Sequence, residues 1–213
     1  DLTHYWPEEK VVYSRSNEVG KMAGVQSNQV QVTMKTDSSY VTPVLDLDAT
    51  HTIIIENIVN YDAAGETGIS GGNAINKYIS QTVTLADGQD AEDIRVYLTA
   101  YRPPGTDVKV YVKIKNVNDP DPIEEKVWTE LSKEGSGDSI YSSITNRLNF
   151  REYSFVAPTS MMSGPQGQIE YDSEDGTTTY TGYKYFAVKI VLLASNPAVV
   201  PRVADLRVLA MQN

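Results

Sequence analysis

The chain has 213 residues, no cysteine, and 28 acidic against 18 basic residues, which gives a net charge of −10 at pH 7. The lack of cysteine excludes disulfides, thiolate metal sites and cysteine nucleophiles. The acidic balance disfavours binding to nucleic acid and to anionic membranes, since both depend on Lys and Arg. The longest apolar run, FAVKIVLLA, is too short to span a membrane and is interrupted by Lys189.

Residues 1–28 are polar and irregular, and we expect them to form an N-terminal arm or a linker. Strand-like runs begin at residue 29, and residues 29–213 are predicted to form a single β domain. Runs rich in Val, Ile, Tyr and Thr, separated by Gly, Pro, Asn and Asp, predict ten strands. These runs are 29–36, 40–48, 50–59, 78–86, 93–101, 107–116, 127–133, 151–157, 184–194 and 201–211.

The clearest pattern is the pair of runs on either side of residues 102–105, where two prolines and Gly105 suit a chain reversal. In the second run an apolar face alternates with a mostly cationic one, as expected of a strand. The apolar face is Val108, Val110, Val112 and Ile114, and the other is Lys109, Tyr111, Lys113 and Lys115. We interpret the lysines as exposed residues that prevent edge-to-edge aggregation rather than as a nucleic-acid stripe.

Helix content should be low, because no long segment repeats its apolar residues every 3.6 positions. The best exception, 139–150, is expected to be a short helix or a turn. The fold class is therefore an all-β antiparallel sandwich or barrel. Two long loops, 60–77 and 157–182, are expected to be binding or interface elements, and the second should fold back as a hairpin at Asp175 and Gly176.

Motifs for catalysis and metal binding are weak. The stretch GISGG (68–72) matches the G-x-S-x-G pattern of a nucleophile elbow, but no predicted strand precedes it. Only His4 and His51 could act as the base, so we interpret the match as chance. The acidic clusters 87–93, 118–125 and 172–176 lack the spacing of a calcium loop and are read as solvated turns. A calcium ion held by separate loops is an open alternative. We predict no catalytic residue, no cofactor and no metal ligand.

Trp128, Tyr101 and Arg102 are the candidate binding residues. They lie near the ends of predicted strands, where they could contact a sugar or a protein. For Trp128 the competing interpretation is an anchor in the core.

Several segments together resemble a known family. TPVLDLD (42–48) and VPRVADLRVLA (200–210) are similar to the first and last strands of a galactose-binding-like, discoidin-type jelly roll. Residues 71–114, together with VVYSRSNEV, YVTPVLDLD and KYFAVKIVLL, resemble a region of virion structural proteins from contractile-tailed phages of marine cyanobacteria and their relatives. The resemblance implies a non-enzymatic tail, baseplate or fibre component, present in many copies and often trimeric. It supplies no catalytic residues.

The leading hypothesis is therefore a virion structural domain that contacts other virion proteins and copies of itself. The alternative is an extracellular carbohydrate-binding module that engages host glycans. A hydrolase on a β scaffold is the third hypothesis, and we do not expect an enzyme, because two histidines and no coherent triad argue against it.

Overall fold

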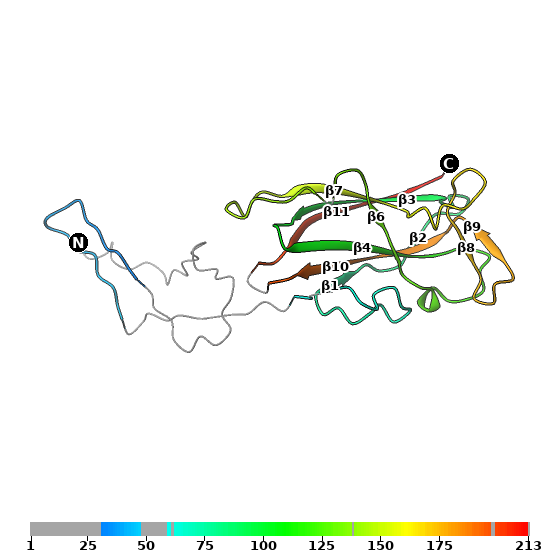
Figure 1. Cartoon of the computed structure of the whole chain (residues 1–213), viewed down its shortest axis with the longest axis horizontal. Helices are drawn as coiled ribbons and strands as arrows, with labels where there is room; N and C mark the ends of the chain where they lie inside the picture. The colour runs from blue at the N-terminus through cyan, green and yellow to red at the C-terminus, as the bar shows by residue number, and fades with distance from the viewer. Residues whose placement is uncertain (1–30, 48–58, 61, 138, 197–198, 213) are drawn as a thin grey trace.

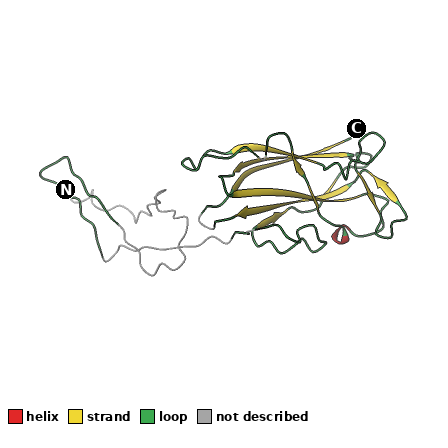
Figure 2. Cartoon of the chain, viewed as in Figure 1, coloured by secondary structure: helices red, strands yellow, loops and turns green. Residues whose placement is uncertain are grey.

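The computed structural model describes residues 31–47, 59–60, 62–137, 139–196 and 199–212, and its body is a two-layer β-sandwich (Figure 1). Strands and loops make up nearly all of the described chain, with one 3-10 turn, η3 (Ile123–Glu125) (Figure 2). The strands are β1 Lys77–Ile79, β2 Val83–Thr84, β3 Asp93–Tyr101, β4 Thr106–Lys115, β5 Thr129–Glu130, β6 Ser132–Lys133, β7 Arg151–Val156, β8 Glu170–Asp172, β9 Thr179–Thr181, β10 Tyr185–Ala194 and β11 Arg202–Met211.

The two layers are separate antiparallel sheets. One has the order β1-β10-β4-β5, with β2 also paired to β10, and the other has the order β11-β3-β7-β6. Strands β8 and β9 form a hairpin of their own. The prediction of an all-β antiparallel sandwich with little helix is confirmed.

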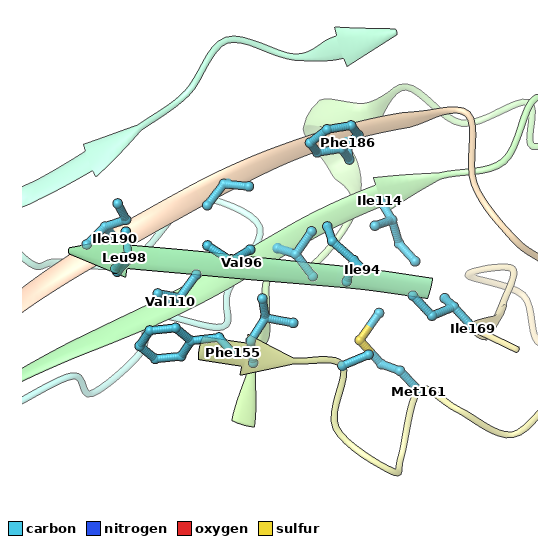
Figure 3. Close-up of a cluster of buried hydrophobic side chains, with 14 of the residues drawn as sticks. Ile94, Val96, Leu98, Val110, Ile114, Phe155, Met161, Ile169, Phe186 and Ile190 are labelled. Carbon is cyan, nitrogen blue, oxygen red and sulfur yellow. The ribbon is translucent and has the colours of Figure 1, made fainter. Parts of the chain in front are cut away.

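The core lies between the two sheets and follows from the period-two pattern of the strands (Figure 3). Alternate residues of β3 point inward and meet alternate residues of β4 and β10 from the facing sheet. The inward residues that Figure 3 labels on these strands are Ile94, Val96, Leu98, Val110, Ile114, Phe186 and Ile190, all buried.

The chain passes from one sheet to the other at several connections, two of which are short. Strand β3 pairs with β11 and β7, whereas β4 pairs with β10 and β5, so residues 102–105 form an arch between layers. Gly105 has φ +83°, a conformation that favours glycine, and the Thr106 N–H donates to Pro103 O at 3.1 Å. Farther along, the predicted strand 127–133 divides into β5 and β6 at the buried residue Leu131.

Some predicted strands differ from the structure. The described parts of runs 29–36 and 40–48 are residues 31–36 and 40–47. They form no strand, because no strand in the described part of the chain supplies the ladder hydrogen bonds that they would need. Most of run 50–59, like the predicted arm 1–28, lies outside the described residues. Residues 139–150 form turns and no helix where described. The predicted hairpin in 157–182 is confirmed as β8–β9, with Gly176 at φ +66° in its turn.

Candidate functional site

Loop 60–77 lies along the outer face of the sheet that contains β10 and β4, and it follows the β1 side in Figure 1. Its two ends are held together at β10, because Asn60 donates from Nδ2 to Asn76 O and to Leu192 O, both at 3.0 Å. Its middle is attached to the segment before β5 by the Trp128 N–H, which donates to Thr67 O at 3.0 Å. The loop is therefore attached to the sandwich at several separate points along its length.

A buried ion pair fixes the centre of this loop. Lys189 on β10 and Glu66 in the loop are 0% and 1% exposed, and Nζ lies 3.1 Å from Glu66 Oε2. The same ammonium donates to Glu66 O and to Gly71 O, the latter at 3.0 Å. Glu66 Oε1 accepts from the Ala74 N–H at 2.6 Å. A buried charge is tolerated only when its partners are satisfied in this way.

Two aromatic rings wall in the ammonium. Lys189 Nζ lies 4.7 Å from the ring centroid of Tyr111 and 4.9 Å from that of Trp128, which are cation–π distances. Burial lowers the pKa of Lys189, while the hydrogen bond and the charge of Glu66 act in the opposite direction. Burial also raises the pKa of Tyr111 above its ordinary value.

Two more lysines hold loop carbonyls. Lys113 on β4 donates to Glu124 O at 2.9 Å and to Ile69 O at 3.3 Å. Lys77 donates to Gly72 O at 2.8 Å. Burial lowers the pKa of Lys113 as well, since it too lies under the loop. Hydrogen bonds from lysine ammonium groups to backbone carbonyl oxygens, rather than a β-ladder, therefore attach these irregular segments to the sheet.

The expectation that the cationic face of β4 is exposed is wrong in its centre. Lys113 and Tyr111 are buried, because loop 60–77 and the segment around Trp128 cover them. Lys109 and Lys115 keep partial exposure, and Lys109 pairs with Glu130 at 2.9 Å. The sequence signal that could have shown this is the glycine-rich loop itself, whose small residues let carbonyl groups approach a sheet closely.

The anchored loop and the adjoining β1–β2 edge expose apolar side chains. The exposed members are Ile69, Ile75, Tyr78, Ile79 and Val83. Exposed apolar side chains that recur along one edge are typical of a protein contact.

The three predicted binding residues are all buried in this structure. Trp128 lies under the loop on the outer face of one sheet, whereas Tyr101 and Arg102 lie at the end of β3 in the other sheet. Arg102 donates from Nε to Asp107 at 2.9 Å, and its guanidinium lies 4.7 Å from the Tyr141 ring centroid. The structure does not bring the three into one surface, and binding through them stays a prediction.

A second buried network attaches the β8–β9 hairpin. The Tyr171 hydroxyl donates to Asp119 at 2.7 Å and accepts from the Asn116 N–H at 2.7 Å, while Lys126 Nζ lies 2.8 Å from Asp119. Burial acts to raise the pKa of Asp119, but the hydrogen bonds from Lys126 and Tyr171 outweigh it and lower that pKa. The interpretation of residues 118–125 as a solvated acidic turn is therefore wrong for Asp119, which is 2% exposed.

The other sequence motifs can be placed in part. The GISGG stretch is a turn within loop 60–77, with the Gly71 N–H donating to Gly68 O at 3.0 Å, while His4 and His51 lie outside the described residues. Within the described ranges, no group of three His, Cys, Asp or Glu side chains is arranged to hold a metal ion. No helix in the described part of the chain has the length and apolar character to cross a membrane.

Comparisons with protein-family models, with curated proteins and with solved structures found no match to this chain.

Proposed function

We propose that this chain is a non-enzymatic structural component of a phage virion, in the tail, baseplate or fibre, that acts through protein–protein contacts. The observation that carries the proposal is the segment 31–47, whose apolar side chains are exposed and take no part in the core of the sandwich. Val44 and Leu47 are 79% and 76% exposed, and Tyr40 is 96% exposed. Apolar side chains at this exposure are stabilised when a partner covers them.

Segment 31–47 is built to make contacts outside its own sandwich. None of its residues belongs to either hydrophobic cluster of the body. The hydrogen bonds described within it are local, as in the Thr36 hydroxyl that donates to Ser38 O at 3.1 Å. A segment of this kind before a rigid β domain suits an arm that binds a neighbouring subunit.

The remaining features support the same proposal. An all-β sandwich is compatible with the resemblance, and we propose a galactose-binding-like jelly roll as its finer class. Loop 60–77 adds a second apolar surface and is held rigid by Lys189 and Glu66. The net charge of −10 limits non-specific adhesion to DNA and to anionic cell surfaces. The expected partners are other virion proteins and further copies of the chain, with a trimer as the expected assembly.

The proposal is tested on virus particles. Particles of the phage whose genome carries this sequence are purified on a density gradient, and the chain is quantified by mass spectrometry against the major capsid protein. We expect the chain to sediment with particles at a fixed copy number. Recovery in the soluble fraction only, with none in the particles, would contradict the proposal.

A further inference from the structure

Strand β11 forms the longest outer edge of the sandwich. It runs for 10 residues and is the end strand of its sheet, paired with β3 on one side. Among the described residues, the one backbone hydrogen bond that β11 makes beyond β3 is from the Glu92 N–H to Met211 O, at 2.7 Å. Its other edge therefore presents a row of backbone groups that are open to a further strand.

The other sheet ends are short by comparison. At the β1 end the outer strands β1 and β2 have 3 and 2 residues, and on the other side β5 and β6 have 2 residues each. Short edge strands are a common protection against unwanted pairing. Strand β11 is not shortened in this way. Its register with β3 shifts between Val203 and Asp205 but is continuous from Asp205 to Met211, so residues 205–211 offer a regular edge for a partner.

The inward face of β11 is left half covered at this edge. Leu206 and Val208 pack against the main core but keep partial exposure, as does Ala210. A strand added beside them would cover these side chains if its own apolar residues alternated in the same way.

Residues 31–36 have that alternation. Val32 and Met34 are apolar and each 52% exposed, and they alternate with Thr33 and Lys35. The segment forms no strand where it lies, although its sequence favours one. The following segment is a poorer match, because Pro43 lacks the N–H group that a ladder requires.

We propose that residues 31–36 of a second copy of this chain add to the free edge of β11 as a further strand, with Val32 and Met34 on the same face as Leu206 and Val208. The inference rests on the proposed function, because it names the partner of segment 31–47. Each copy donates residues 31–36 and accepts the same segment at a different surface, so the exchange closes either reciprocally between two copies or around a ring such as a trimer, as the rotation allows.

The test uses cysteine pairs in the full chain, which is free of background because the native sequence has no cysteine. Leu209 lies on the outward face of β11 and is 46% exposed, so Leu209→Cys is the acceptor. Thr33→Cys and Lys35→Cys, made singly, are the donors whose side chains should share that face. Val32→Cys and Met34→Cys are the matched controls, because they should point to the opposite face. Donor and acceptor chains are purified separately, mixed and oxidised.

We expect Leu209→Cys to form a disulfide-linked pair with the chain carrying Thr33→Cys or Lys35→Cys, in several-fold higher yield than with either control. Equal yields from all four donors would overturn the inference, because random collision ignores the strand alternation. Leu209→Cys linking mainly to itself would also overturn it, in favour of two β11 edges that pair directly.

Failure here is distinguishable from failure of the proposed function. A chain that is recovered in virions but gives no selective disulfide disproves the arm–edge contact alone. A chain that forms the selective disulfide but is absent from virions keeps the contact and disproves the virion role.

Discussion

Lys189 and Glu66 form an ion pair that is closed to solvent and joins β10 to the centre of loop 60–77, with 3.1 Å between Nζ and Oε2. The ammonium is also bound by two loop carbonyls and two aromatic rings. An irregular glycine-rich loop thereby becomes a fixed surface of the sandwich, which is what a contact surface requires.

Removing one member of this pair should be strongly destabilising. Lys189→Met leaves the Glu66 carboxylate buried without its cation, so we expect the free energy of unfolding to fall by about 3–5 kcal/mol. Urea denaturation at pH 7 measures this. Lys109→Met is the matched control, because Lys109 forms a half-exposed pair with Glu130 on the same outer face and should cost less than about 1 kcal/mol.

The double variant Lys189→Met with Glu66→Gln should recover part of the loss, because neither charge is then buried alone. The comparison is with the single variants Lys189→Met and Glu66→Gln. If the double variant lost as much stability as the two single variants together, the residues would not be coupled, which would contradict the ion pair as the anchor of the loop.

A pair of glycine variants tests the packing around Glu66. Gly72 and Gly65 have nearly the same backbone, with φ +75° and +74°. A Cβ at Gly72 would lie 2.3 Å from Glu66 Oε1, whereas a Cβ at Gly65 meets nothing within 4 Å. Both alanine variants carry the left-handed penalty of about 1–2 kcal/mol.

Gly72→Ala should cost more than Gly65→Ala by about 1–3 kcal/mol, since Glu66 is buried and paired and cannot give way freely. Thermal unfolding by calorimetry compares the two variants. Equal midpoints would mean that Glu66 does not occupy this position.

Acid should weaken the network that attaches the β8–β9 hairpin. The pKa of Asp119 is lowered in the folded state from its ordinary value of 3.8, which the unfolded chain keeps. At a pH between the folded pKa and 3.8, Asp119 is therefore protonated mainly in the unfolded chain. The stabilisation is therefore complete above about pH 4 and is lost as the pH falls through the folded pKa.

Asp119→Asn should reduce stability at pH 7 and lose less further stability between pH 4 and pH 2 than the native chain. Asp37→Asn, at an exposed position in segment 31–47, is the control and should follow the native profile. A native and an Asp119→Asn profile of the same shape would argue against the ionised Asp119 in this network.

Trp128 separates the virion hypothesis from the carbohydrate-binding alternative. Its side chain is 5% exposed beneath loop 60–77, so Trp128→Ala should cost about 3–5 kcal/mol by cavity formation. The neighbouring Val127→Ala, at a 60% exposed position, should stay within about 0.5 kcal/mol. A Trp128→Ala chain of native stability that lost binding on a glycan array would instead favour a sugar platform.

The sequence predicts the sandwich well where strands have neighbours in the same chain. Run 93–101 coincides with β3, and the alternation in β4 identifies the face that enters the core between the sheets, because period-two patterning reports the burial of a paired strand. The same patterning in residues 31–36 predicted a strand that this chain alone does not form, since alternation does not reveal whether a partner strand is present.

The ion pair of Lys189 and Glu66 could not be predicted from the sequence, for a different reason. Lys189 interrupts an apolar run and Glu66 lies in a glycine-rich loop 123 positions away, so nothing local links them. Buried lysines are rare unless they are paired, and a lone Lys within FAVKIVLLA was the available hint. The partner became evident only when the fold placed the loop on β10.

The most direct test of the central claim is the solution mass of the chain, measured by light scattering with and without residues 1–47. The account predicts an assembly of several copies for the full chain and a monomer after truncation. The truncated chain should still unfold cooperatively, because residues 31–47 contribute to neither hydrophobic cluster of the sandwich. A full chain that is monomeric, or a truncated chain that stays assembled, would contradict the role of the arm.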